Sequence, residues 1–317
     1  MSLSFFRPPE DGIAISARDL QKTYYGKVPK TALYGVSLDI PAGSIFGLLG
    51  PNGAGKSSFI NILAGTVIKT AGQACVWGAD IDDNPRQARA NIGIVPQELN
   101  IDAYFTPRET LEMQAGLFGV PPSERRSDAI LDMVGLGDQA HTYARRLSGG
   151  MRRRLLVAKA MVHAPPILVL DEPTAGVDVE LRRSLWQYVR RLHEAGTTII
   201  LTTHYLEEAE ELCDEIAIVN HGEIIACEPT GQLLKRLDQR LLVVTPREPL
   251  AAVPDSLKDL AIRLKPNGDL EITYRNSETG IGRLLERVRE AGIGVADLST
   301  DQPNLEDVFV AMTTETA

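Results

Sequence analysis

Two segments of the chain have the residue types and spacing of phosphate-binding elements. The earlier one is a glycine-rich run made of Gly50, Pro51, Asn52, Gly53, Ala54, Gly55, Lys56 and Ser57, with Ser58 directly after it. Glycines let backbone N–H groups converge on a phosphate, Lys56 would place its charge between the β- and γ-phosphates, and Ser57 would give a hydroxyl to Mg²⁺. An apolar strand expected over 44–49 and a helix over 56–64 supply the strand–loop–helix context that a nucleoside triphosphate site needs.

The later segment consists of Leu147, Ser148, Gly149, Gly150 and Met151. A serine and two glycines just before a predicted helix form a second anion site, because the first turn of a helix has free N–H groups. One nucleotide does not easily need both elements from the same subunit. These residues alone therefore leave the second site without an assigned nucleotide.

Two carboxylates and a histidine follow predicted strands and are expected at one edge of a parallel sheet. Asp171 and Glu172 come directly after an apolar strand over 167–170, and His204 follows the next strand, over 197–201. Ligands bind at the carboxyl ends of strands in open α/β folds. Asp171 suits Mg²⁺, and Glu172 can polarise an attacking water as general base. A lone histidine is usually structural, but this strand order favours a bond from His204 to the γ-phosphate.

Three further features admit more than one interpretation. Gln97 ends a strand that opens into a helical region, so it is either an ordinary polar residue or a Mg²⁺ and water ligand that senses the γ-phosphate. Tyr24 or Tyr25 could stack on the base, or fill a minor core; we favour stacking by Tyr24. Arginines crowd the segment around the second anion site, and we expect a solvated or interface helix face rather than a nucleic-acid patch. They are Arg145, Arg146, Arg152, Arg153 and Arg154.

Composition narrows the classes of protein. A net charge of −9 and a pI near 5.2 argue against a broad electrostatic grip on nucleic acid or anionic lipid. No apolar run reaches the roughly 18 residues of a membrane-spanning helix, and the first residues do not form a signal peptide. Cys75, Cys213 and Cys227 lack metal-ligand spacing, so we expect reduced thiols in a cytoplasmic protein.

Strands that alternate with helices predict an α/β fold with a mostly parallel sheet. We expect one nucleotide-binding domain over 11–235, with short antiparallel strands over 12–43 and a helical subdomain over about 100–163. Inside that subdomain, Thr106 and Glu109 form a predicted capping box, and Ser123 is expected to cap the next helix. From about 240 to 317 the sequence pattern changes, and we expect a small α+β accessory domain there, with a proline-rich segment over 245–254.

Taken together, these motifs resemble the ATP-binding subunit of ABC transporters over roughly 13–228. The resemblance implies a P-loop NTPase cassette with an antiparallel β subdomain and a helical subdomain. It assigns adenine stacking to Tyr24, the Walker A loop to 50–57 and the Q-loop to Gln97. It also assigns Walker B to Asp171 with Glu172, the D-loop to residues 175–178, which end in Asp178, and the switch histidine to His204. Met151, Ser58 and Val177 depart from common family residues, but none removes a group that touches phosphate or metal.

In that family the run at 147–151 meets the ATP of another subunit. The resemblance therefore implies a head-to-tail homodimer around two MgATP, in which Ser148, Gly149 and Gly150 complete the partner's site. Segments 147–151, 202–209 and 304–309 look like ABC-2 exporter subunits, which work with a separate membrane permease of about six spanning helices. We expect a peripheral protein on the cytoplasmic membrane face. An importer ATPase and a soluble ABC ATPase of translation or chromosome maintenance are the alternatives.

Overall fold

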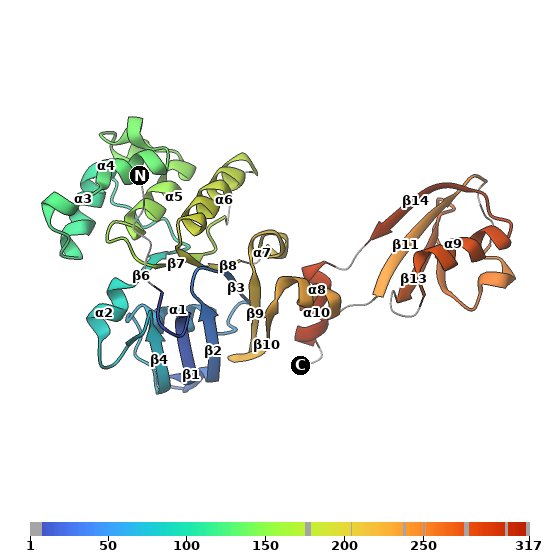
Figure 1. Cartoon of the computed structure of the whole chain (residues 1–317), viewed down its shortest axis with the longest axis horizontal. Helices are drawn as coiled ribbons and strands as arrows, with labels where there is room; N and C mark the ends of the chain where they lie inside the picture. The colour runs from blue at the N-terminus through green and yellow to red at the C-terminus, as the bar shows by residue number, and fades with distance from the viewer. Residues whose placement is uncertain are drawn as a thin grey trace. The chain divides into compact units, whose positions relative to one another are not determined.

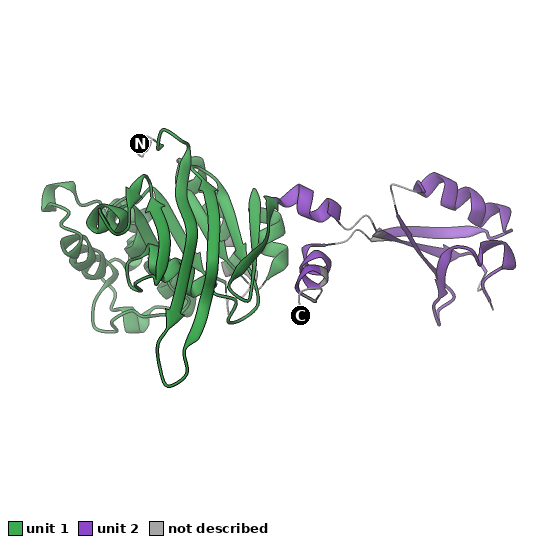
Figure 2. Ribbon diagram, turned by 90° about the horizontal axis from the view of Figure 1, so that it is seen from below, with its two compact units in different colours: residues 1–228 green, residues 229–317 purple. Residues whose placement is uncertain are grey.

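The computed structural model describes residues 8–174, 179–203, 205–236, 239–248, 250, 252–275, 279–301 and 304–314. The chain divides into two compact units, residues 1–228 and 229–317, shown in different colours in Figure 2. The second unit therefore includes a helix over 230–236 that falls within the range expected for the nucleotide-binding domain. Each unit is described separately below.

A mostly parallel sheet forms the centre of the first unit (Figure 1). Within the described residues it has six strands in the order β10-β9-β3-β8-β7-β6. Their bounds are β3 Ile45–Leu49, β6 Ile92–Val95, β7 Ile167–Asp171, β8 Thr198–Thr202, β9 Glu215–Asn220 and β10 Glu223–Pro229. Strands β3 and β8 are buried along their whole length, which explains their nearly continuous apolar sequences.

An antiparallel sheet lies beside this centre, with strand order β2-β1-β4-β5 among the described residues. Strands β1 (Ile13–Tyr24) and β2 (Lys30–Pro41) pair over most of their length, so the strands expected over 12–43 are longer than predicted. The other two are β4 (Ala71–Val76) and β5 (Ala79–Asp80). Helix α1 (Lys56–Leu63) buries Phe59, Ile60, Ile62 and Leu63 in a core shared with these strands. Helix α2 (Pro85–Ala90) precedes β6.

Helices α3 (Pro107–Leu117), α4 (Ser127–Met133) and α5 (Gly149–Ala160) form a helical subdomain. Short 3₁₀ turns at 122–124, 137–139 and 144–146 connect them. The predicted capping box is confirmed, because the Glu109 N–H donates to Thr106 Oγ1 and the Thr106 N–H donates to Glu109 Oε2. The expected cap at Ser123 is wrong, since this residue lies in a 3₁₀ turn and α4 begins later, at Ser127.

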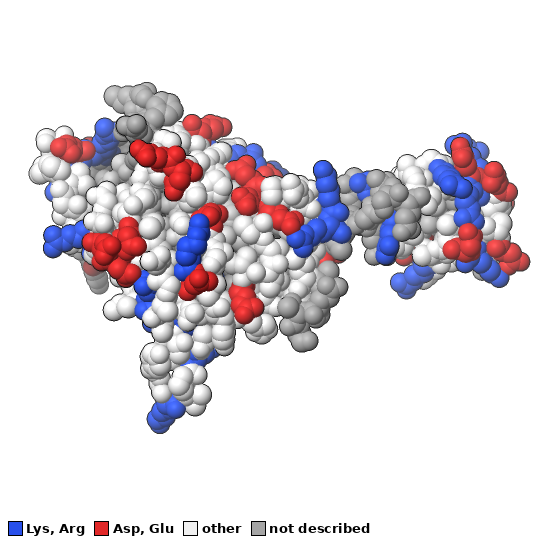
Figure 3. All heavy atoms as spheres, turned by 60° about the horizontal axis from the view of Figure 1, so that its bottom comes forward, with Lys and Arg blue, Asp and Glu red and all other residues white. Residues whose placement is uncertain are grey.

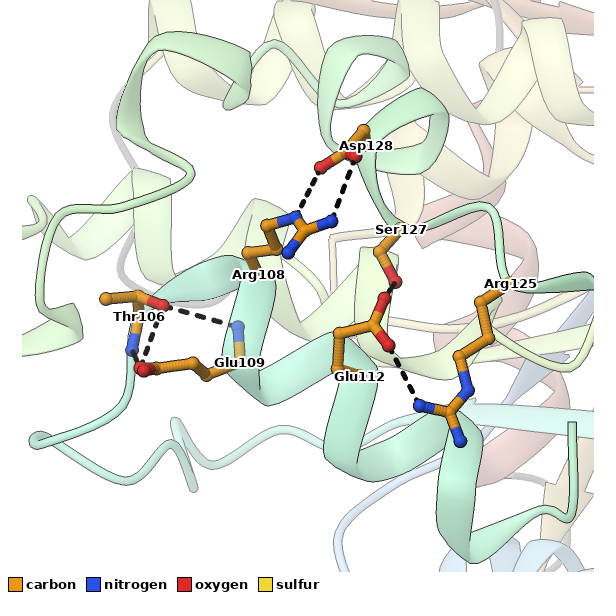
Figure 4. Close-up of polar contacts among 7 residues, drawn as sticks. All are labelled: Thr106, Arg108, Glu109, Glu112, Arg125, Ser127 and Asp128. Atoms are coloured by element: carbon orange, nitrogen blue, oxygen red, sulfur yellow. Dashed lines mark hydrogen bonds and ion pairs between the residues drawn. The ribbon is translucent and has the colours of Figure 1, made fainter. Parts of the chain in front are cut away.

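Polar contacts fix α3 against α4, as Figure 4 shows. Arg108 Nε and Nη2 donate to the two carboxylate oxygens of Asp128, at 2.8 and 3.3 Å. Glu112 accepts from the Ser127 hydroxyl at 2.6 Å and from Arg125 Nη1 at 2.9 Å. These bonds hold the pKa of the Glu112 carboxyl below its usual range. The first two helices of the subdomain are thus tied to each other by charged hydrogen bonds as well as by packing.

Two further helices connect strands of the central sheet, one long and one short. Helix α6 spans Val179–Glu194 between β7 and β8, and α7 spans Leu206–Leu212 between β8 and β9. On the face drawn in Figure 3, lysine and arginine side chains are interspersed with aspartate and glutamate among uncharged residues. Among the described residues, no helix is both long enough and apolar enough to cross a membrane.

The second unit contains a small α+β module. Within its described residues, four antiparallel strands are ordered β12-β13-β11-β14. Their bounds are β11 Gln239–Pro246, β12 Ala261–Leu264, β13 Leu270–Arg275 and β14 Val295–Asp301. Helix α9 (Ile281–Glu290) buries Leu284 and Val288 against this sheet. Helices α8 (Thr230–Arg236) and α10 (Leu305–Thr314) lie side by side (Figure 1). The proline-rich segment expected from 245 on begins inside β11, because Pro246 closes that strand.

Candidate nucleotide-binding site

The central sheet brings the predicted site segments to one edge. Strands β3, β8, β7 and β6 are consecutive neighbours and pair in parallel, so their carboxyl ends lie together. The glycine-rich loop follows β3, Asp171 ends β7 and Gln97 follows β6. His204 comes shortly after β8 in the sequence and lies outside the described residues. Residues from distant parts of the sequence therefore meet at the position where open α/β sheets bind ligands.

The loop between β3 and α1 has a backbone that only glycine fits at its last turn. Gly55 has φ +112° and is the N-cap of α1, and a Cβ there would lie 2.5 Å from the Ala32 carbonyl oxygen. Gly50 approaches the Val219 carbonyl oxygen too closely to carry a side chain. The loop is thus pressed against β2 and β9 at these two glycines, whereas Asn52 and Gly53 are exposed at its tip, where a phosphate can approach the backbone.

Lys56 is folded over this loop. Its Nζ donates to the carbonyl oxygens of Gly50 at 2.5 Å and Pro51 at 3.1 Å. Burial lowers the pKa of the Lys56 ammonium, and the negative charges of Glu172 and Asp171 oppose that shift. Phosphate oxygens would therefore stabilise a cation that is already partly removed from water.

A cavity of about 260 Å³ opens above the loop and contacts nearly all the predicted residues of one site. Tyr24, Gln97, Asp171 and Glu172 line it. The Tyr24 hydroxyl lies 3.1 Å from Ser58 Oγ, and Tyr25 does not line the cavity. The remaining walls are formed by Lys30, Ala32, Asn52, Gly53, Ala54, Gly55, Lys56, Ser57 and Ser58. The structure thus places an aromatic ring, a phosphate loop and two carboxylates around one space.

Thr202, at the end of β8, bonds the carboxylate of Asp171 and the backbone of Glu172. Its hydroxyl donates to Asp171 Oδ1 at 2.5 Å and accepts from the Glu172 N–H at 3.1 Å. The same N–H lies 3.0 Å from the Thr202 carbonyl oxygen. Glu172 has φ +45°, a left-handed conformation that costs about 1–3 kcal/mol in a non-glycine residue. The bonds to Thr202 hold Glu172 in this conformation, with its side chain turned to the cavity.

Sequence reasoning did not assign Thr202 or Lys30 to the site. Thr202 entered the sequence analysis only as part of the segment 202–209, although a fully buried hydroxyl beside Asp171 is a signal once the strand order is known. Lys30 belongs to β2 and carries no motif. Gln97 was predicted, and the structure adds its contact: Gln97 Nε2 donates to Glu172 Oε2 at 2.7 Å. Asp178, like His204, lies outside the described residues.

The second anion site is separate from this cavity. Ser148 caps α5, and its Oγ accepts from the Met151 N–H at 3.2 Å. Ser148 and Gly149 are exposed and Gly150 is partly exposed, and none of the three lines the cavity. Their helix N-terminus therefore faces outward, free to meet a phosphate carried by another molecule.

One interpretation of the arginines needs correction. The segment at 145–154 was expected to be a solvated or interface face, and Arg145 and Arg146 are indeed exposed. Arg153 is not, because its side chain is buried and only 5% of the residue is exposed. The helix turns by about 100° per residue, so three consecutive arginines cannot all face solvent when the helix packs on a core.

The phosphate loop, the carboxylate pair and the sheet edge define the class of a P-loop nucleoside triphosphatase. A family model described as ABC transporter matches residues 33–175. The Nod factor export ATP-binding protein I of Ralstonia nicotianae is 35% identical over 318 residues, which cover 98% of each chain. The daunorubicin/doxorubicin resistance ATP-binding protein DrrA of Streptomyces peucetius is 36% identical, covering 95% of this chain and 92% of the relative.

A third relative and a solved structure agree with these matches. The linearmycin resistance ATP-binding protein LnrL of Bacillus subtilis is 34% identical over 95% of this chain and 99% of its own. The dimeric post-hydrolysis state of the ATP-binding cassette MJ0796, bound to ADP and Pi, has a TM-score of 0.61 and 26% identity, covering 68% of this chain and 98% of that one. This chain belongs to the family of ABC transporter ATP-binding proteins, and it is an ATPase.

Proposed function

We propose that the chain is the ATPase of a membrane exporter and works as a head-to-tail dimer around two MgATP. The observation that carries the proposal is the division of site residues between two places. Tyr24, residues 52–58, Gln97, Asp171 and Glu172 line the cavity, whereas Ser148, Gly149 and Gly150 do not line it and are at least partly exposed. A second copy in the opposite orientation would bring the missing phosphate donors, as in the dimeric cassette of similar fold.

Magnesium fits the residues at the cavity. Mg²⁺ prefers oxygen ligands, and the Ser57 hydroxyl, the Gln97 side-chain amide and the Asp171 carboxylate all line the same space. The bond from Thr202 leaves Asp171 one fully available oxygen and keeps its carboxylate in a fixed orientation. A bound Mg²⁺ would offset the negative charge of the β- and γ-phosphates.

Hydrolysis requires a base beside the γ-phosphate, and Glu172 is placed for that role. Its carboxylate lines the cavity together with Lys56, which would stabilise the phosphate charge as it develops. Gln97, which now donates to Glu172, would have to release that carboxylate before it can take a proton from water. We assign His204 to the γ-phosphate and Asp178 to the interface with the second copy, both by family resemblance.

A groove on the first unit could receive the membrane partner. It has a volume of about 670 Å³ and lies between the helical subdomain and the α2–β6 segment that leads to Gln97. Arg86 and Arg89 line one part, and Leu117 and Phe118 line another. Leu117 is 76% exposed and the adjacent Phe118 is 40% exposed, so the groove presents two neighbouring apolar side chains at the surface.

The groove has a rigid apolar wall on its inner side. The Phe118 ring stacks on the His163 imidazole, with centroids 3.7 Å apart, and His163 Nε2 lies 3.2 Å from the Ile92 carbonyl oxygen. We propose that a cytoplasmic helix of an ABC-2-type permease docks here and keeps the ATPase at the cytoplasmic membrane face. Relatives named for Nod factor export and drug resistance support the export direction.

Co-purification tests the proposal. The tagged chain should purify from membranes with a polytopic membrane protein, and ATPase activity of that complex should exceed the activity of the isolated chain. Lys56→Ala should keep the membrane partner but lose nucleotide binding. Leu117→Asp, placed in the groove, should lose the partner while ATP binding persists. Purification with ribosomes and without a membrane protein would contradict an exporter role.

A further inference from the structure

The buried guanidinium of Arg153 lies inside the first unit, one and a half helical turns after Ser148. Its neighbours Arg152 and Arg154 are partly exposed, whereas Arg153 is 5% exposed. A guanidinium is rarely buried without a carboxylate bonded to it, because removing its charge from water is unfavourable. The groups that compensate this charge therefore indicate what the residue does.

Arg153 hydrogen-bonds to the backbone of the Q-loop. Its Nη1 donates to the Pro96 carbonyl oxygen at 2.8 Å, and Pro96 directly precedes Gln97. Gln97 in turn donates to Glu172. Burial lowers the pKa of the Arg153 guanidinium, and the negative charge of Asp171 opposes that shift. Arg153 is thus bonded to the loop that contacts the general base, and it feels the charge of the other carboxylate of the pair.

Arg154 attaches the same helix to the end of α4. Its Nη1 donates to the carbonyl oxygens of Val134 at 2.9 Å and Gly135 at 3.0 Å, at the end of α4. Consecutive residues of α5 therefore bond the Q-loop and the end of α4, which belongs to the same helical subdomain. Leu155, Leu156 and Val157 are buried as well, so apolar packing adds to these polar contacts in fixing α5.

The N-terminus of α5 is the second anion site. Ser148 caps the helix, and Arg153 lies on its second turn, roughly 6–8 Å along the axis at 1.5 Å per residue. A shift of the Pro96 carbonyl would be transmitted to Ser148 and Gly149 through a short and rigid segment. Two further links join the same parts of the first unit: backbone bonds from the Ala144 and Arg145 N–H groups to the carbonyl oxygens of Phe105 and Ala103, and packing of α5 on β6. The Arg153 bond is the one that a side chain of α5 makes to the residue next to Gln97.

We propose that Arg153 is a positioning residue that couples the chain's own ATP site, through the Q-loop, to the Ser148–Gly150 segment it presents to a second copy. The coupling rests on the proposed dimer function. When Gln97 leaves Glu172 for the nucleotide, Pro96 moves with it, and Arg153 carries α5 to the position that binds the partner's γ-phosphate. A chain without its own ATP would then be a poor partner for a loaded copy.

The matched variants are Arg153→Met, which keeps length and removes the donor, Arg153→Lys, which keeps one donor, and Arg152→Met as a control on the same helix. Each is combined with Glu172→Gln so that ATP persists. Light scattering measures the ATP concentration at half-maximal dimer, and equilibrium binding at low protein concentration measures ATP affinity of the monomer. Hydrogen exchange at low protein concentration follows residues 96–106 and 147–152 separately.

For Arg153→Met we expect at least a tenfold higher ATP concentration for dimer formation, with monomer affinity within threefold. ATP should still change exchange at 96–106, and the change at 147–152 should be lost. Arg153→Lys should restore part of both effects, and Arg152→Met should resemble the parent. If Glu172→Gln alone stays monomeric, the shared-site function fails and the coupling with it. If the parent dimerises and Arg153→Met dimerises equally well, or loses ATP binding in the monomer, only the coupling is wrong.

Discussion

Substituting Thr202 by valine removes one hydroxyl at the centre of the site while keeping the side-chain shape. The hydroxyl donates to Asp171 at 2.5 Å and accepts from the Glu172 N–H at 3.1 Å. A hydrogen bond to a charged group contributes about 1.5–3 kcal/mol. The Glu172 N–H keeps the Thr202 carbonyl oxygen at 3.0 Å, so the loss falls mainly on the orientation of Asp171.

If most of that free energy is expressed in positioning Mg²⁺ and Glu172, kcat for ATP hydrolysis should fall about 10- to 100-fold. KM for ATP should change by less than about threefold, because the Lys56 loop is untouched. Steady-state ATPase kinetics of the isolated chain measure both quantities. Thr202→Ser retains the hydroxyl and is the matched control, with kcat expected within about threefold of the parent.

Three results would refute this reasoning. Thr202→Val with unchanged kcat would show that the hydroxyl does not hold the carboxylate in its working orientation. Thr202→Ser that is as slow as Thr202→Val would assign the effect to the lost methyl group and to packing in β8. A rise in KM without a fall in kcat would place Thr202 in nucleotide binding instead.

Three further predictions concern single residues. Tyr24→Ala should weaken ATP binding about 5- to 100-fold, as expected for loss of one stacking contact, whereas Tyr25→Ala should leave it unchanged. Equilibrium binding measures both affinities, and equal effects of the two substitutions would contradict the choice of Tyr24. Gly55→Ala should destabilise the first unit by more than Gly119→Ala does. Gly119 is the control because it also has positive φ, but nothing lies close to the position of its Cβ. Calorimetry that ranks the two variants the other way would contradict the close contact between Gly55 and the Ala32 carbonyl oxygen. Burial lowers the pKa of His163 from 6.5 to about 4, so its contribution to stability is full above about pH 6.5 and is lost as pH falls towards 4. Relative to His163→Gln, the parent should lose about 2 kcal/mol of unfolding free energy between pH 7.5 and 5, as measured by urea titration. Identical dependence of the unfolding free energy on pH in the two proteins would refute burial of the neutral imidazole.

The segments that lie at the sheet edge could be predicted from the sequence, because each of them depends on local patterns. A glycine-rich loop between a strand and a helix, and two acids after an apolar strand, both follow from residues that are close in sequence. Their meeting at one sheet edge followed from the parallel topology that alternating strands and helices imply. The structure bears out that topology, with β3, β8, β7 and β6 in consecutive order.

Contacts between distant segments were beyond the sequence. Thr202 belongs to the site only because β8 pairs with β7 at the register that sets it opposite Asp171. Arg153 could not be distinguished from Arg152 and Arg154, since arginine stems cover either face of a helix. Strand β14 was missed because this edge strand is largely exposed and lacks an apolar alternation.

The central claim is that each ATP lies between two copies of the chain. It is tested most directly by the mass of Glu172→Gln with and without MgATP, measured by size-exclusion chromatography with light scattering. We expect a dimer only with MgATP, and the same variant with Ser148→Arg, which blocks the second anion site, should bind ATP but stay monomeric. A Glu172→Gln protein that remains monomeric at saturating MgATP, or a dimer that Ser148→Arg does not disrupt, would contradict the shared site.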